Sequence, residues 1–335
     1  MLRILLLLRG LLTALLLLLT IATASAQGDF AVTDTNAPPP TPLPTGMILI
    51  PGAISRSSDS RTALPENGAI VKDVYENAYF GLSYALPQDW VQEFNGPPPS
   101  DMGRYVLAEL SPSKSFKGAS RGSVLITAQD LFFSPGSAHT AAEMIRNSVD
   151  HLPSYYKLES PPADLTIANH RVTRFDYTSP EAGLHWRVLA TEVRCHAVQF
   201  VLTSADTQLL DTIVDGLKNS AFLAEGVSGH GGGDVPVCVR NYAVPANIEY
   251  RVEPVMTMHK GESMPVRIII AKSGKVQHVH VISAFAETAS IITDALLQWR
   301  FKPYLVNGEP VAVETGLVFG LDRNRVAAPK TAARE

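Results

Sequence analysis

The sequence predicts an α+β protein with two folded domains: an N-terminal α/β domain on an antiparallel sheet and a small strand–strand–helix–strand domain. Three observations support this prediction. Many short apolar runs, rich in β-branched and aromatic residues, lie between Gly, Pro and Asp breaks. Beyond the N-terminal apolar run, only three stretches place apolar residues at helical spacing. A glycine-rich stretch at 226–233 separates the two patterned regions.

The chain begins with an apolar segment typical of exported proteins. Arg3 supplies a positive start, and the sequence Ala-Ser-Ala at 24–26 is a small-residue cleavage pattern. We therefore expect residues 1–26 to be a signal peptide, and the mature protein to be periplasmic or secreted. An uncleaved anchor over 4–24, snorkelling Arg9, is the alternative, and only then is membrane contact expected. No cysteine follows the run, which excludes a lipoprotein anchor at this site.

Composition limits the partners. The chain is mildly acidic, with a net charge of −4 at pH 7, and cleavage would remove two arginines. This charge is a poor match for nucleic acid, so no nucleic-acid partner is expected. The sequence has no Walker loop, dinucleotide fingerprint or calcium-loop pattern, so we expect no cofactor.

Cys195 and Cys238 are the two cysteines of the chain. In an exported protein they permit a disulfide, which would close a loop of about 44 residues and stabilise the fold by roughly 4 kcal/mol. The alternative, which we favour slightly, is two unrelated thiols, one inside a strand and one in a linker.

Three further segments are expected to lie outside the folded domains, and the first and last of them to be disordered. Residues 27–72 are rich in Pro, Thr, Ser and Ala, with APPPTPLPTG at 37–46, and should form an extended, solvated spacer. Only 47–50 has the composition of a short strand. The glycine linker at 226–233 and the tail at 322–335 are the other two segments.

Residues 73–225 are expected to form the first domain. Its helices are predicted at 139–151, where Thr140 and Glu143 have capping-box spacing, and at 207–219, after Asp206 as N-cap. Short connections favour an antiparallel sheet. The expected strands are 75–84, 104–110, 123–129, 165–168, 172–177, 186–194 and 197–203.

The first of these strands belongs to the sequence YENAYFGLSYALPQDW, where a short hairpin leads into Pro-x-x-Trp. This opening resembles the start of the PsbP-like fold, and the closing strand pair and helix resemble its end. The resemblance covers about 150 residues and implies a PsbP-like α/β domain at 73–225.

Residues 234–321 are expected to form the second domain. Strands are predicted at 265–271 and 276–282 around a Ser-Gly turn, followed by a helix at 286–298 and a last strand at 311–319. In the last strand, Val311, Val313 and Leu317 share one face with Phe319, and Thr315 lies between them.

The sequence from PVRIIIAKSG to ETGLVF resembles the TonB C-terminal domain family, over residues about 245–321. The resemblance lies in the Ser-Gly turn, the helix ending in Leu-x-x-Trp, the W-x-F-x-P motif, Asn-Gly and the final strand. It implies a protein-binding domain without catalytic residues. Trp299 and Phe301 would close the helix onto the sheet.

In a TonB-like arrangement the last strand lies at a sheet edge, where unpaired N–H and C=O groups can accept another chain. We predict that Val311, Val313, Thr315 and Leu317 form a binding strand. Its partner would be an extended segment of an envelope protein, or a second copy of this chain. Gly316 would let a backbone approach, and proline at Thr315 would remove one donor.

A secreted serine hydrolase is the alternative function. Gly118 to Gly122 is a formal G-x-S-x-G motif with Ser120 as nucleophile, and His230 to Gly233 spells HGGG. Context argues against it. A nucleophile elbow needs a strand before and a helix after, and the oxyanion-hole motif should precede the nucleophile. We therefore predict a protein that is not an enzyme and has no catalytic residues.

A small-ligand or metal binder is the third possibility. His278 and His280 lie two apart on one strand, so both rings share a face and could bind zinc with His259. The alternative is a polar strand face, and no metal site is predicted. Asp89, Glu93 and Asp101 lie near a loop at Trp90. Nothing enforces the spacing that acid–base chemistry needs, so they are expected to be solvated.

Overall fold

The computed structural model describes residues 47–49, 64–66, 68–94, 99–100, 102–114, 121–134, 138–222, 236–255, 263–284 and 286–320. Within these ranges the chain is mostly sheet, with three α-helices, and it has the α+β class that the sequence predicts. All of these described residues belong to one compact unit. None of the described helices is long and apolar enough to cross a membrane.

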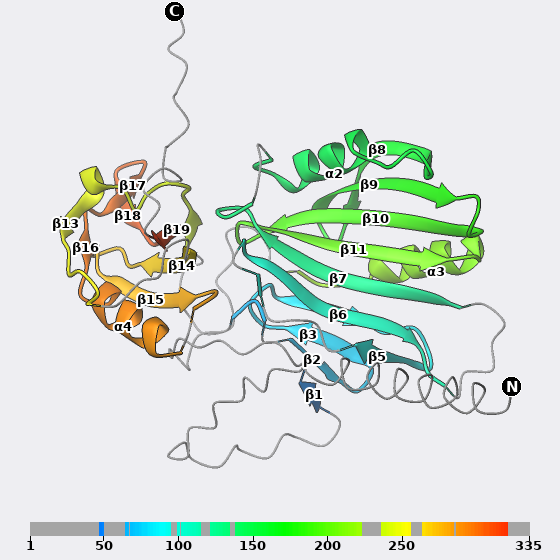
Figure 1. Cartoon of the computed structure of the whole chain (residues 1–335), viewed down its shortest axis with the longest axis horizontal. Coiled ribbons are helices and arrows are strands. Elements are labelled where there is room, and N and C mark those ends of the chain that lie inside the picture. The colour runs from blue at the N-terminus through cyan, green and yellow to red at the C-terminus, as the bar shows by residue number, and fades with distance from the viewer. Residues whose placement is uncertain are drawn as a thin grey trace, which may run out of the picture. The chain divides into compact units, whose positions relative to one another are not determined.

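The larger sheet has seven strands in the order β5-β6-β7-β11-β10-β9-β8 (Figure 1). Every neighbouring pair is antiparallel, as the short connections predict. Its strands are β5 (Trp90–Phe94), β6 (Arg104–Pro112), β7 (Gly122–Asp130), β8 (Lys157–Ile167), β9 (His170–Ser179), β10 (Leu184–Val193) and β11 (His196–Ser204).

Two helices cover opposite faces of this sheet. The first, α2 (Ala141–Asp150), packs Ile145 against Val188 and Ala190 of β10. The other, α3 (Thr207–Leu217), packs on the face that carries Leu189. This is the opposite face from Val188 and Ala190, because successive strand residues point to opposite sides of the sheet. Both predicted caps are present. The N–H of Glu143 donates to Thr140 Oγ1, and the N–H groups of Gln208 and Leu209 donate to Asp206 Oδ1.

A second sheet, in the order β1-β2-β3-β4, precedes the larger one in the chain. It shows that the prediction of a solvated spacer over 27–72 was wrong for the end of that range. Strand β2 falls inside 27–72, where a solvated chain was expected, and Ile70 is buried in the main core. The region has few apolar residues, and its pairing with β1 and β3 makes it a strand. Trp90 likewise begins β5 instead of lying in a loop. The strands are β1 (Met47–Leu49), β2 (Gly68–Val71), β3 (Val74–Asn77) and β4 (Leu82–Ala85).

The C-terminal sheet has the order β12-β19-β14-β15, with α4 packed on one face. Trp299 is buried after this helix, and its Nε1–H donates to Val252 O at 2.7 Å. Phe301 lies beside it, so the pair joins helix and sheet as expected. The elements are β12 (Val237–Cys238), β14 (Ser263–Ile270), β15 (Val276–Val281), α4 (Ala286–Leu296) and β19 (Val313–Gly320).

The predicted strand at 311–319 is two elements. Val311 ends β18 (Glu309–Val311), which pairs with β17 (Tyr304–Val306) around a tight turn. Asn307 and Gly308 both have positive φ in that turn, which explains the Asn-Gly sequence. The break at Ala312 separates Val311 from the strand that carries Val313, Thr315 and Leu317. Two further short strands, β13 (Ile248–Tyr250) and β16 (Arg300–Phe301), pair with each other beside η1 (Pro245–Asn247).

Candidate functional site

Strand β19 has one fully paired side and one partly paired side. It pairs with β14 along its whole length, but with β12 only at its start. There the N–H of Val237 donates to Ala312 O at 2.8 Å, and the N–H of Val239 donates to Glu314 O at 3.0 Å. Backbone groups alternate in direction along a strand, so even-numbered residues face β12 and odd-numbered residues face β14. Within the described ranges, no strand pairs with the β12 side of β19 after Glu314.

The unpaired backbone groups of the predicted binding strand belong to other residues than those predicted. Val313 and Thr315 are buried, Leu317 is half-buried, and their backbone groups are directed at β14. The outward backbone groups belong instead to Gly316 and Val318, and Val318 is 42% exposed. Proline at Thr315 would therefore break the internal ladder and not the open edge.

Gly316 also has a different neighbour from the one expected. A Cβ at this position would lie 2.8 Å from Phe133 Cζ and 2.9 Å from Phe132 Cβ. Those distances are shorter than real Cβ contacts, so the glycine lets two aromatic residues of the segment after β7 pack on β19. The close approach is internal and lies on the face of the strand, whereas strand addition would use its edge.

A buried ion cluster joins the C-terminal sheet to the seven-stranded sheet. We use this name for Asp130, Arg194, Arg267 and Glu314. The Arg267 guanidinium lies 2.6 Å from Asp130 Oδ2 and 3.1 Å from Glu314 Oε1. Glu314 also lies 3.2 Å from Arg194 Nη2 and accepts a hydrogen bond of 2.9 Å from the Tyr79 hydroxyl. Each charge thus has an opposite partner, which burial requires.

The two carboxylates of the cluster respond differently. Burial opposes ionisation of Glu314, but the charges of Arg267 and Arg194 outweigh it and lower its pKa to about 2. Burial raises the pKa of Asp130, and Arg267 offsets this only in part. His196 lies beside them, with Nε2 3.7 Å from Asp130 Oδ2. Burial, reinforced by the charge of Arg267, keeps the pKa of His196 well below its ordinary value, so its ring is neutral.

The two cysteines form a disulfide, which corrects the sequence-based preference for separate thiols. Cys195 lies in the turn between β10 and β11, and Cys238 lies on β12, with their Cα atoms 5.9 Å apart. Linear spacing could not show that β12 returns to this turn. The disulfide ties β12, and through it the start of β19, to the seven-stranded sheet.

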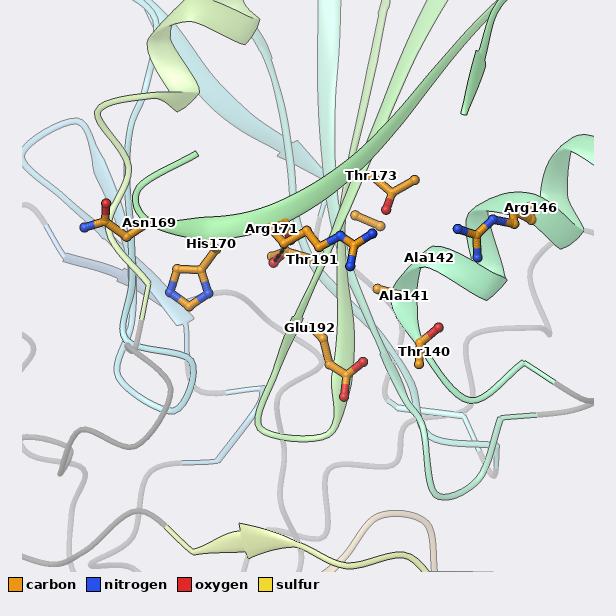
Figure 2. Close-up of a pocket in the computed structure, with 11 residues that line it drawn as sticks. Thr140, Ala141, Ala142, Arg146, Asn169, His170, Arg171, Thr173, Thr191 and Glu192 are labelled. Atoms are coloured by element: carbon orange, nitrogen blue, oxygen red, sulfur yellow. Dashed lines mark hydrogen bonds between the residues drawn. The ribbon is translucent and has the colours of Figure 1, made fainter. Parts of the chain in front are cut away.

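A groove of about 760 Å³ lies on the α2 face of the seven-stranded sheet (Figure 2). The first half of α2 forms its wall, and β9 and β10 form its floor, with the turn between β8 and β9 at one end. Its lining is Thr140, Ala141, Ala142, Arg146, Asn169, His170, Arg171, Thr173, Ala190, Thr191 and Glu192.

The other residues considered for chemistry are not brought into one site by the described structure. Ser120, the HGGG segment, His259 and Asp101 lie outside the described residues. His280 Nε2 lies 2.9 Å from Glu66 Oε1 in a buried pair, and His278 is also buried. The described ranges contain no group of three or more His, Cys, Asp or Glu side chains arranged to hold a metal. Asp89 has positive φ in the turn before β5.

Sequence reasoning missed the ion cluster and the groove. Arg267 stands in the apolar sequence PVRIII, and Glu314 alternates with core residues. A charge at such a position is typical of a solvated strand face. A single arginine between apolar residues was the only signal, and it does not reveal that a second sheet covers that face.

No protein-family model matches this chain, and no curated protein matches it. Solved structures match part of it. LpqN of Mycobacterium tuberculosis, described as involved in cell envelope biogenesis, is 9% identical with a TM-score of 0.30, covering 43% of this chain and 83% of that one. Cyanobacterial PsbP of Synechocystis sp. PCC 6803 is 14% identical with a TM-score of 0.26, covering 41% and 85%. PA94 of Pseudomonas aeruginosa, a putative regulator of unknown function, is 19% identical with a TM-score of 0.25, covering 40% and 83%. All three TM-scores are low.

Proposed function

We propose that this is an exported, non-catalytic binding protein that captures an extended segment of an envelope protein along β19. The observation that carries the proposal is the outward side of β19 after Glu314. Its opposite side is fully paired with β14, so the strand is held rigidly as a template. The backbone groups of Gly316 and Val318 are directed to the side on which no described strand lies. An added strand would satisfy those groups, and main-chain hydrogen bonds of this kind supply affinity.

Two features support a location outside the cytoplasm. The N-terminal sequence has the positive start, apolar run and small-residue pattern of a signal peptide. The Cys195–Cys238 disulfide is of the kind that persists in oxidising compartments such as the periplasm. A periplasmic or secreted protein meets envelope proteins as its ordinary partners.

The family resemblances support the same proposal. Strands β14 and β15, helix α4 and strand β19 follow the chain in the order that a TonB C-terminal domain implies. In that arrangement the last strand is the one offered to a partner. A PsbP-like α/β domain at 73–225 then serves as the body on which this binding domain is carried.

The proposal assigns no catalytic residue. The charged groups of the buried ion cluster contact one another, so their role is to join the two sheets. The partner is recognised by its backbone and by a short alternating side-chain pattern.

Val318→Pro tests the proposal, because it removes an outward N–H donor without touching the ladder to β14. Val318→Thr is the matched control, since it keeps the N–H and the β-branched shape. A photo-crosslinking residue at Val318 should attach to one defined envelope protein in cells, and a copy at the exposed residue Leu305 should not. Val318→Pro should abolish copurification of that protein, while Val318→Thr should preserve it.

Two results together would show that the partner of β19 is a second copy of this chain and not an envelope protein. The residue at Val318 would crosslink to another copy, and sedimentation would show a dimer that Val318→Pro dissociates. Slow hydrogen exchange at the Gly316 and Val318 amides in the isolated monomer would contradict strand addition altogether, because the edge would then be paired within the chain.

A further inference from the structure

The groove under α2 carries charge where the rest of that face is apolar. Ile145 of α2 lies in one buried apolar cluster with Phe175 and Val188. Near the helix N-terminus the same face of β9 and β10 carries Arg171, Thr173 and Glu192 in place of apolar residues. A volume of about 760 Å³ falls within the range of small-molecule sites, about 300–1,000 Å³. The groove is therefore large enough for a ligand and is not an extension of the core.

Arg171 is held in position by a carboxylate on the neighbouring strand. Its Nε donates to Asp164 Oδ2 at 3.0 Å and its Nη2 contacts the same oxygen, while the Thr173 hydroxyl donates to Asp164 Oδ1 at 2.7 Å. One edge of the guanidinium is thus occupied, and the remaining N–H groups are available. The Arg171 side chain is 75% exposed, so these donors are accessible from solvent.

Arg146 supplies a second guanidinium from the opposite wall. It projects from α2, and Figure 2 shows its head group and that of Arg171 directed toward each other across the groove. Within the described ranges the side chain of Arg146 makes no hydrogen bond and no ion pair. Hydrogen bonds from Arg171 and Thr173, together with the charges of Arg171 and Arg146, lower the pKa of Asp164. Arg146 is therefore close enough to act on this end of the groove electrostatically.

The two guanidinium groups are paired unequally. Arg171 forms an ion pair with Asp164, whereas the Arg146 side chain has no ion pair within the described residues. Ala141 and Ala142, the first two residues of α2, line the same wall. Glu192 adds a negative charge to the lining, which opposes a simple anion. Arginine pairs favour planar or tetrahedral anions, because the fork of donors matches two oxygens at once.

We propose that this groove binds a small molecule through a carboxylate or phosphate group held between Arg146 and Arg171. The site lies on the seven-stranded sheet and is distinct from β19, so it is a second binding function and does not depend on strand addition. The Thr140 and Thr173 hydroxyls lie in the same lining and would contact the rest of the ligand. Glu192 would disfavour ligands with a second negative charge near β10.

Calorimetric titration of the purified full-length chain tests the site. Inorganic phosphate and butyrate, a monocarboxylate, are the two probes, each at constant ionic strength with chloride as the competing anion. Saturable binding of phosphate alone would assign a phosphate ligand, and saturable binding of butyrate alone would assign a carboxylate ligand. Either result supports the site only if the variants below respond as expected.

Arg146→Ala should weaken binding about tenfold or more, because a charge-assisted hydrogen bond to the anion is lost. Arg146 is exposed on a helix, so this variant should fold normally. Glu192→Gln should strengthen binding several-fold, a change that a general loss of structure cannot produce. Arg104→Ala removes an exposed arginine outside the groove and should change nothing.

Binding of neither probe at millimolar concentration would overturn the proposal. Equal binding by Arg146→Ala and Arg104→Ala would also overturn it, because the anion would then be responding to surface charge in general.

Discussion

The guanidinium of Arg267 and the carboxylate of Asp130 lie 2.6 Å apart, although 137 residues separate them in the chain. Arg267 belongs to the C-terminal sheet and Asp130 ends a strand of the seven-stranded sheet. Both side chains are almost wholly inaccessible to solvent. The two sheets therefore share a polar interior that neither could bury alone.

Arg267→Met should destabilise the protein by about 3–5 kcal/mol, because removal of one partner leaves the carboxylates of Asp130 and Glu314 buried without their shared cation. Equilibrium urea unfolding measures the change. Arg104→Ala, an exposed arginine on β6, is the control and should lie within about 0.5 kcal/mol of the unsubstituted chain. An equal effect of the two variants would mean that the cluster is solvated and does not couple the sheets.

Stability should fall in acid because of Glu314. Its pKa is lowered to about 2 in the folded chain from an ordinary value of 4.5, so its contribution is complete above about pH 4.5 and is lost as pH falls toward 2. Glu314→Gln removes this carboxylate and should flatten the pH dependence in that window.

Asp130 and His196, which lie beside Glu314, also change the free energy of unfolding with pH. The raised pKa of Asp130 acts with the opposite sign and weakens the folded state as pH rises through that pKa. The depressed pKa of His196 costs stability as pH falls below 6.5, where the unfolded ring becomes charged. The free energy of unfolding of the unsubstituted protein and of Glu314→Gln, measured from pH 7 to 2, separates the effect of Glu314 from those of Asp130 and His196. Parallel curves below pH 4.5 would show that Glu314 does not titrate differently in the folded state.

Replacement of both cysteines by serine should lower the free energy of unfolding by about 2–4 kcal/mol, because the disulfide closes a loop across a sequence separation of 43 residues. The loss should be seen first at β12, whose two residues are exposed and whose ladder to β19 is short. Hydrogen exchange should show the Val237 and Val239 amides losing protection before the amides of β14. Uniform loss across both sheets would mean that the disulfide acts only on the unfolded chain.

Trp299→Ala should cost about 3–5 kcal/mol, since it empties a buried site between α4 and the sheet and removes the hydrogen bond to Val252 O. Trp299→Phe keeps much of the packing and serves as the graded control. Amides of β14 and β15 should lose protection in the alanine variant before those of β10 and β11. Simultaneous loss in both sheets would show that the chain unfolds as one unit and that 73–225 and 234–321 are not separate folding domains.

Local patterns in the sequence were sufficient for the elements of the fold. Thr140 with Glu143, and Asp206, were predicted as caps because a capping side chain bonds a backbone group two or three residues away. The alternation of Val266 and Ile268, and the Asn-Gly turn at 307–308, likewise depend only on near neighbours. Such interactions act within a few residues, so the sequence alone determined the helices, most strands and the antiparallel class of the larger sheet.

Only the tertiary structure decided which faces and edges are covered. Glu314 has the alternation expected of a solvated strand residue, yet it is buried because Arg194 and Arg267 arrive from distant parts of the chain. Strand β12 is too short to be predicted, and it shields the start of β19 because a disulfide holds it there. The groove arginines come from a helix and a strand with no shared motif. Pairing between distant segments depends on how the whole chain folds, and the local spacing of apolar residues in the sequence does not show it.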